Sequence, residues 1–259
     1  MNSNKEVVPL RTRKDSIYQK GTNEVFKISR SKFSNFLDCA RCFYLERVKG
    51  LKDPSMPGWA LNTAVDELLK KEFDHYRKIQ KPHPFITKNK LNFIPFQHEK
   101  IDYWRDALRG GITFTDPDTN LEIHGGLDDI WFDAENKELI VVDYKAQSKK
   151  EAVAIEAYLE DQYHQNYKVQ MDIYVYILRQ MKFKVSDTAY FLVCNGLKTP
   201  EKFDATLQFD LTLVPYKTND SWVKNKILDM KKTLESKDVP DLNKYCEKCM
   251  YLDTGKNFI

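Results

Sequence analysis

Long apolar runs are missing from this sequence. No stretch is long enough to span a bilayer, and residues 1–20 are polar and charged, without the apolar core of a signal peptide. Cysteine is also scarce, at 5 of 259 residues, and we find no repeats or low-complexity segments. We therefore expect a cytoplasmic protein without a membrane partner, whose cysteines serve packing or metal binding rather than disulfides.

The chain also lacks a strong excess of either charge. Its 41 Lys and Arg residues face 38 Asp and Glu residues, a formal net charge of +3. This balance does not demonstrate a nucleic-acid partner, although a basic groove is a local feature that the total can hide. With 42% hydrophobic residues the chain can bury a sizeable core. We predict a flexible leader over residues 1–27 and a single domain over 28–259.

The pattern of apolar and capping residues predicts α-helices in the first part of the chain. A serine-capped amphipathic helix is expected from Ser29 to Leu45, and a second helix over Ala60–Tyr76 follows a break at prolines. Residues 77–118 contain further prolines and a short helix over 98–109. We interpret this stretch as an insertion.

Strands and helices then alternate. The strongest strand pattern covers residues 121–131 and resumes over 138–145 after a turn, which predicts a hairpin. The remaining expected elements are a helical stretch over 152–181 broken near Asp161, strands over 188–194 and 203–213, a helix over 221–236, and an irregular tail from Pro240.

The hairpin carries a candidate metal site. Residues two apart on a strand share a face, so Asp143 and Lys145 point the same way. If the turn is centred between Glu135 and Asn136, residues whose numbers sum to 271 lie opposite one another, which places Asp128 against Asp143. Directly opposed like charges are destabilising, and a divalent cation bound by both carboxylates would offset the repulsion.

Lys145 on the same face could orient or deprotonate a water molecule and stabilise charge on a scissile phosphate. The alternative interpretation is structural. Asp128 and Asp129 would then be turn or edge-strand charges, and Lys145 a solvated strand end.

The segments Gly125-Gly126-Leu127-Asp128 and Val141-Val142-Asp143-Tyr144-Lys145, followed by Gln170-Met-Asp-Ile-Tyr174, resemble the RecB-like branch of the PD-(D/E)XK nucleases. The resemblance implies an α/β restriction-endonuclease-like core with a mixed central sheet flanked by helices. It further implies that Asp128, Asp143 and the main-chain carbonyl of Tyr144 bind magnesium or manganese, and that Lys145 activates the attacking water.

Gln170 and Tyr174 lie one helical turn apart. They are similar to the Q-x-x-x-Y motif of this family, which orients the substrate beside the active site, although such a pair also occurs on ordinary helix faces. The sequence departs from the family at Asn62, in Gly58-Trp-Ala-Leu-Asn62, where the family has a metal-binding histidine. Asn62 offers a neutral amide oxygen instead, and Asp66 one turn further could partly replace the histidine.

Two C-x-x-C pairs form a second candidate metal site. Cys39 and Cys42 are expected on one helix face, and Cys246 and Cys249 lie near the other end of the chain. Four thiolates suit zinc or an iron-sulfur cluster, and their spacing alone does not separate the two. A shared metal would clasp the N-terminal helix to the C-terminal tail.

The iron-sulfur nucleases of the superfamily, such as AddB and the CRISPR spacer-acquisition nucleases, place one cysteine before the core and three after it. This resemblance favours a [4Fe-4S] cluster at Cys39, Cys42, Cys246 and Cys249, with zinc as the alternative. The match is incomplete, because Gly255 stands near the place of the last expected cysteine.

We predict a metal-dependent DNA nuclease, acting on ends or single strands, with partners in a DNA repair, recombination or defence complex. The first alternative is a catalytically weakened nuclease-fold protein that binds DNA or assembles with a partner. The second is a metal-clasped protein whose main task is redox sensing or assembly. DNA cleavage assays distinguish the nuclease from the weakened nuclease-fold protein. The metal content tests the redox or assembly alternative.

Overall fold

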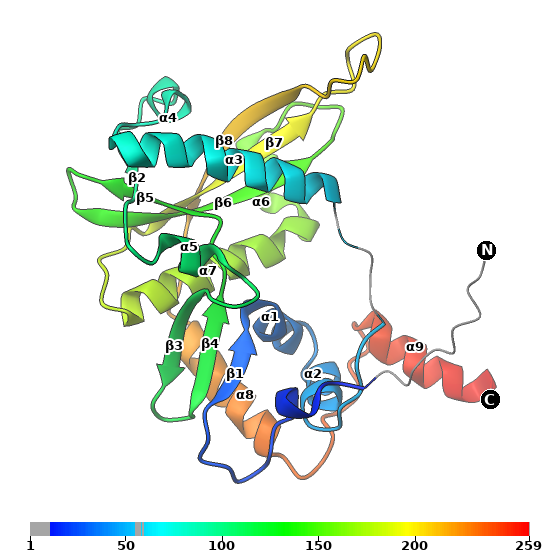
Figure 1. Ribbon diagram of the computed structural model, residues 1–259. Helices are drawn as coiled ribbons and strands as arrows, with labels where there is room; N and C mark the ends of the chain where they lie inside the picture. Colours follow the sequence, from blue (N-terminus) through cyan, green and yellow to red (C-terminus); the bar gives the residue numbers. More distant parts are fainter. Residues whose placement is uncertain (1–10, 55–57, 59, 259) are drawn as a thin grey trace. The chain divides into compact units, whose positions relative to one another are not determined.

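The computed structural model describes residues 11–54, 58 and 60–258 (Figure 1). Contacts divide the chain into two compact units, one from the described parts of residues 1–57, 115–123 and 224–259, the other from 58–114 and 124–223. Residues 1–10 of the expected leader lie outside the described residues, and Tyr18 within it is buried. The domain boundaries expected from the sequence stay a prediction.

A five-stranded mixed sheet forms the centre of the second unit. Its strands follow the order β2-β5-β6-β7-β8, in which β6 and β7 run parallel and all other neighbours are antiparallel. The strands are β2 (Phe93–Pro95), β5 (Asp129–Asp133), β6 (Glu138–Gln147), β7 (Thr188–Gly196) and β8 (Phe209–Lys217). With helices packed on this sheet, the α/β fold expected from the sequence is confirmed.

The register of the hairpin is the one expected from the sequence. The paired residues run from Asp129 opposite Val142 to Asp133 opposite Glu138, and the numbers in each pair sum to 271. The turn fixes this register, because Asp133 Oδ1 accepts hydrogen bonds from the amides of Glu135 and Asn136 and so holds the turn at one position.

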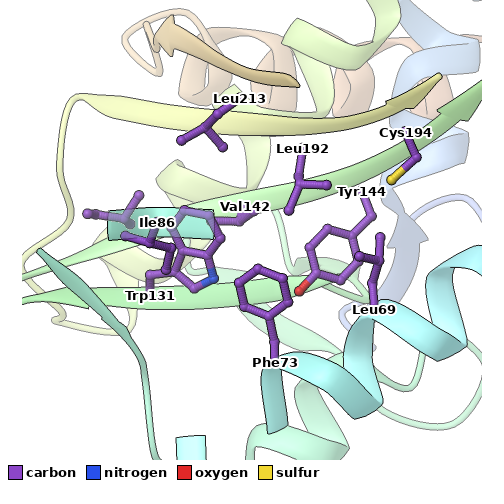
Figure 2. Close-up of a cluster of buried hydrophobic side chains, with 10 residues drawn as sticks. Leu69, Phe73, Ile86, Trp131, Val142, Tyr144, Leu192, Cys194 and Leu213 are labelled. Carbon is purple, nitrogen blue, oxygen red and sulfur yellow. The ribbon is translucent and has the colours of Figure 1, made fainter. Parts of the chain in front are cut away.

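Two long helices pack on the two faces of β6. Leu69 and Phe73 of α3 (Ala60–Ile79) pack into a buried cluster with Trp131, Val142 and Tyr144 (Figure 2). Residues on β6 alternate between faces, so Asp143 points away from this cluster, toward α7 (Gln165–Gln180). The segment over residues 143–145 therefore has an apolar side that anchors it and a polar side that faces α7.

The rest of the second unit consists of shorter helices, and their positions correct two predictions. The expected helix over 98–109 is only α5 (Ile101–Arg105), because the Asp106 carboxylate accepts hydrogen bonds from the amides of Leu108 and Arg109 in a turn. The expected strand over 203–213 begins later, as β8. The break near Asp161 is confirmed. The other elements are α4 (Pro84–Lys88), α6 (Ile155–Glu160) and η2 (Gln162–His164).

The expected continuous strand over 121–131 is wrong. It is divided into β4 (Leu121–Gly125) and β5, and the two belong to different sheets. Close packing and a hydrogen bond outside the sheet both interrupt the strand after Gly125. A Cβ at Gly126 would lie 2.8 Å from the backbone of Ala107, and the amide of Leu127 donates to the Trp104 carbonyl rather than to a strand. Asp128 thereby stands at the mouth of the hairpin instead of inside a ladder.

The first unit contains shorter elements. A three-stranded sheet has the order β1-β4-β3, with β1 (Phe26–Ser29) and β3 (Ile112–Asp116) at its edges. The remaining elements are η1 (Lys14–Ser16), α1 (Arg30–Asp38), α2 (Ala40–Arg47), α8 (Val223–Glu235), α9 (Glu247–Gly255) and η3 (Lys256–Phe258).

Two predictions for this unit are corrected. The helix expected from Ser29 to Leu45 begins at its serine cap, where Ser29 Oγ accepts from the Lys32 amide, but it breaks at Cys39. The extended backbone of Cys39, with φ of −161°, makes this residue the N-cap of a new helix, α2. The tail after Pro240 is likewise not irregular throughout, since it contains α9. Within the described ranges, no helix is both long and apolar enough to cross a bilayer.

Candidate active site and cysteine cluster

Asp128 and Asp143 meet at the open end of the hairpin. Asp128 lies one position beyond the last ladder pair, Asp129 with Val142, and its Oδ2 accepts a hydrogen bond of 2.8 Å from the Tyr144 amide. The Asp128 side chain is 23% exposed and that of Asp143 is 1% exposed. The two carboxylates therefore occupy the opposed positions that the register predicts, one buried and one reachable from solvent.

Lys145 and α7 complete the polar side of the site. Lys145 Nζ forms an ion pair with Asp143 Oδ2 and lies 4.5 Å from the centre of the Tyr167 ring. Gln170 Nε2 donates to Asp143 Oδ1 over 2.5 Å. The stacking of Lys145 over Tyr167 was not expected from the sequence, because no spacing rule links a strand residue to a particular ring of a later helix.

The Gln170 and Tyr174 pair spans the two halves of the site. While Gln170 contacts Asp143, the Tyr174 hydroxyl donates to the Gly126 carbonyl over 2.7 Å, two residues before Asp128. Gln170 Nε2 also lies 3.3 Å from the Tyr174 hydroxyl. One helical turn thus contacts both carboxylate-bearing segments.

Helix α3 contributes a third carboxylate and a second lysine. Lys70 Nζ lies 2.8 Å from Asp66 Oδ2 and 3.9 Å from Asp128 Oδ1. Lys70 was missed in the sequence, although it stands one helical turn after Asp66 and could have been found on that face. Asn62 is exposed and lines a cavity of about 250 Å³ with Gln147 at the end of β6. Its role as a metal ligand stays a prediction.

The charges of this group are not balanced. Three carboxylates, on Asp66, Asp128 and Asp143, meet two ammonium groups, on Lys70 and Lys145. Burial and the nearby charge of Asp143 raise the pKa of Asp128 to about 7. Burial and Asp128 also raise the pKa of Asp66. The carboxylates thus carry one negative charge more than the two lysines neutralise. A divalent cation would relieve this excess.

Individual atoms also fit a cation. Asp66 Oδ1 is buried, and within the described part of the chain it accepts no hydrogen bond. Burial lowers the pKa of Lys145, but the charges of Asp143 and Asp128 outweigh burial and raise the pKa overall. Lys145 therefore stays an ammonium group at neutral pH. Asp128, Asp143 and the Tyr144 carbonyl are the groups that would hold magnesium or manganese. Asp66 lies on the same side, but the oxygen atoms of the three carboxylates do not all come within 4.8 Å of one another, so Asp66 would reach a shared ion only by a side-chain movement.

Asp129, the neighbour of Asp128, has a different environment. It is fully buried, with Arg77 Nη2 at 2.5 Å and Arg105 Nη2 at 3.0 Å from its Oδ1. Its Oδ2 accepts hydrogen bonds from the Tyr144 hydroxyl and the Trp131 indole. Burial raises the pKa of Asp129, but the charges of the two arginines outweigh this and lower the pKa overall.

The two arginines also bind Asp74 on α3. Arg105 Nη1 lies 2.8 Å from Asp74 Oδ1, and Arg77 Nε lies 2.9 Å from the same atom. This network was missed in the sequence, because its members come from α3, α5 and β5 without a shared spacing. It anchors the hairpin beneath the candidate active site.

The four cysteines meet in the first unit, as the paired C-x-x-C motifs predict. Their sulfur atoms all lie within 4.8 Å of one another. Among the described residues this is the one group of three or more acidic, histidine or cysteine side chains with ligand atoms so close. Burial raises the pKa of the Cys42 thiol, and the neighbouring cysteines raise it further, so four thiolates would need a cation to coexist. Cys194 is separate from this group and lies on β7, buried in the core of the second unit.

Three of the five histidines have structural environments. His83 caps α4 and stacks on Phe73 with ring centres 4.3 Å apart. His164 Nδ1 lies 2.9 Å from the Tyr158 carbonyl, and His98 stacks on Trp104. In these contacts the three side chains serve packing and capping.

A comparison with known families bears on these observations. The family model of the PD-(D/E)XK nuclease superfamily matches residues 58–254, which include the hairpin, α3 and α7. The chain belongs to the PD-(D/E)XK nuclease superfamily. Membership supports a metal-dependent nuclease activity, since nucleases of this superfamily are in general hydrolytic and use divalent metals. No curated protein matches the chain.

Proposed function

We propose that this PD-(D/E)XK nuclease hydrolyses phosphodiester bonds of DNA with a divalent metal, acting on ends or single strands. The observation that carries the proposal is the grouping of Asp128, Asp143 and Lys145 at the mouth of the hairpin, with more carboxylates than ammonium groups. The preference for ends or single strands rests on the resemblance to RecB-like nucleases.

The chain's own residues have distinct tasks in this proposal. Asp128 and Asp143, with the Tyr144 carbonyl, hold the metal, which when bound supplies a Lewis acid and lowers the pKa of water. Gln170 fixes the Asp143 carboxylate by a hydrogen bond, and Tyr174 fixes the Gly126 carbonyl just before Asp128. Positioning of this kind keeps the ligands in place before substrate arrives.

Lys145 supplies the positive charge at the reaction centre in this proposal. Because its pKa is raised, it is an ammonium group at neutral pH, able to orient the attacking water and to stabilise negative charge on the phosphate. The Tyr167 ring beneath it limits its side-chain rotation. A strongly solvated lysine at a strand end, the structural alternative, would lack both the buried carboxylate and the aromatic contact.

The second candidate function is a nuclease-fold protein that binds DNA or a partner without cutting it. Asn62 in place of the family histidine favours this candidate, since an amide oxygen is a weaker ligand than an imidazole. Asp66 argues for metal binding, because its Oδ1 has no hydrogen-bond partner among the described residues and the residue lies near Asp128. It offers a further carboxylate oxygen from the same helix as Asn62.

Cleavage of labelled oligonucleotides tests the proposal. Wild-type protein is incubated with single-stranded DNA, double-stranded DNA and RNA of one sequence, each with magnesium, manganese or EDTA. We expect metal-dependent cutting of DNA, reduced roughly 10³-fold by Lys145→Ala. The matched control is Lys184→Ala, an exposed lysine near the start of β6, which should cut normally.

An inactive wild type that still binds DNA would establish the second candidate. Equal rates for wild type and Lys145→Ala would overturn the enzymatic role of this lysine. Cutting of RNA but not DNA would overturn the substrate.

A further inference from the structure

We propose that the four cysteines hold a single tetrahedral zinc ion, rather than the iron-sulfur cluster that the resemblance to iron-sulfur nucleases implies. The inference concerns the first unit and does not depend on the nuclease activity. It rests on the spacing of the sulfur atoms and on how each cysteine pair begins a helix.

The sulfur spacing suits one shared ion. The sulfur of Cys39 lies 3.4 Å from that of Cys249, and the sulfur of Cys42 lies 3.5 Å from Cys249 and 3.7 Å from Cys246. Zinc–sulfur bonds of about 2.3 Å in a tetrahedron place neighbouring sulfurs about 3.8 Å apart. The observed separations are close to this value.

A four-iron cluster needs a wider arrangement. Each of its cysteines binds a different iron atom, so the body of the cluster separates the four sulfur atoms. Here all four lie within 4.8 Å of one another, which leaves room for one ion between them and not for a cube of iron and sulfide. The residues present therefore do not fit the cluster.

The two pairs are built alike. Cys39 and Cys246 each have an extended backbone and act as the N-cap of a helix, α2 and α9 respectively. Cys42 and Cys249 follow in the first turn, and the Cys42 amide donates to Cys39 Sγ over 3.4 Å. An amide directed at a sulfur, and the positive end of a helix, both stabilise a thiolate.

This two-plus-two symmetry differs from the one-plus-three division of the iron-sulfur nucleases. Two short helices, each beginning at a cysteine, bring the four sulfurs within 4.8 Å of one another. Cys39 and Cys249 are buried, while Cys42 and Cys246 are partly exposed, so the ion would lie just beneath the surface.

A zinc ion here would be a structural clasp. It would join segments whose cysteines are 204 to 210 residues apart, and it would hold α2 against α9 within the first unit. Closing so long a loop restricts the unfolded chain more than a local zinc ribbon does. Zinc has no redox chemistry in proteins, so the clasp would not respond to electron donors as a cluster would.

Metal analysis of the full-length protein tests this inference. The protein is produced with iron and zinc both supplied and purified anaerobically without a metal-binding tag. Iron and zinc are measured by elemental mass spectrometry, and acid-labile sulfide by a colorimetric assay. We expect about one zinc per chain and a colourless protein. Iron and sulfide near four atoms each, with a brown colour, would overturn the proposal.

Variants and a spectroscopic probe locate the ion. Cys42→Ser should lose zinc, whereas Cys194→Ser, at a buried cysteine outside the cluster, should retain it. If Cys42→Ser does not fold, cobalt replacement in the wild type serves instead, and the visible bands of tetrahedral cobalt thiolate are expected. A cobalt spectrum without thiolate bands would contradict the site. Neither measurement depends on DNA cleavage, so failure of the nuclease proposal leaves it intact.

Discussion

Two neighbouring aspartates in the second unit have opposite surroundings. In the group around Asp128, three carboxylates meet the two ammonium groups of Lys70 and Lys145. In the group around Asp129, two carboxylates meet the two guanidinium groups of Arg77 and Arg105. The pKa of Asp128 is accordingly raised to about 7, by burial and by Asp143, while the charges of the arginines hold the pKa of Asp129 below its ordinary value.

The charges around Asp129 suit a structural role, whereas those around Asp128 suit metal binding. A buried carboxylate with matched guanidinium partners needs no ion, and removing either partner leaves an unpaired charge in the core. A carboxylate beside another carboxylate is held in an unfavourable state that a cation relieves. Adjacent positions on one strand end can therefore serve stability and metal binding separately.

The largest effect should separate the two aspartates. Asp128→Asn removes a proposed metal ligand, and we expect DNA cleavage to fall roughly 10³-fold with no loss of stability. Asp129→Asn leaves two buried guanidinium groups under-neutralised, and we expect the free energy of unfolding to fall by about 3 kcal/mol while the folded protein still cuts. Urea unfolding and initial cleavage rates measure the two effects.

Each variant is the control for the other. If Asp129→Asn were as inactive as Asp128→Asn at a temperature where it is folded, the division into a structural and a reactive group would be lost.

A smaller effect is expected at Asp66. Asp66→Asn removes the third carboxylate from the reactive group, and we expect the affinity for manganese to fall about 10-fold to 100-fold. The measurement is titration calorimetry or electron paramagnetic resonance without DNA. Glu67→Gln, at the exposed neighbouring position, is the control and should bind manganese normally. Unchanged affinity in Asp66→Asn would place Asp66 outside the metal site.

The smallest effect is the pH dependence of stability in EDTA. The folded pKa of Asp128 lies above the unfolded value, so its stabilising contribution is present below pH 4 and is lost as the pH rises to about 7. For Asp129 the sign is reversed, since a lowered folded pKa gives stability that is lost only as the pH falls below about 4.

We therefore expect Asp128→Asn to be more stable than wild type at pH 8 by about 2 kcal/mol, and to lose that advantage by pH 5. Urea unfolding at both pH values is the measurement. Parallel stability profiles for the two proteins would contradict a raised pKa at Asp128.

Local rules were sufficient for the hairpin. The alternation of strand residues and the turn at Asp133 predicted the register that places Asp128 opposite Asp143. The spacing of Gln170 and Tyr174 predicted a shared helix face, and the paired C-x-x-C motifs predicted that the four cysteines meet. In each case the relevant residues lie close in sequence or carry a chemistry that few other arrangements satisfy.

Other features were beyond local rules. The break of a predicted helix at Cys39 follows from its extended backbone beside three other sulfurs, which are up to 210 residues distant. The division of a predicted strand at Gly126 follows from close contact with Ala107 in another segment. Local sequence propensities contain no information about either neighbour, because both lie in other segments of the chain.

The sequence by itself determined the α/β class, the carboxylate pair with its lysine, and the meeting of four cysteines, because these depend on periodicity, register and ligand type. The tertiary structure decided which charges are compensated. It placed Arg77 and Arg105 on Asp129 and left Asp128 beside Asp143, since guanidinium and carboxylate groups from separate elements pair only once packing brings them together. It also set the sulfur spacing on which the choice of zinc depends.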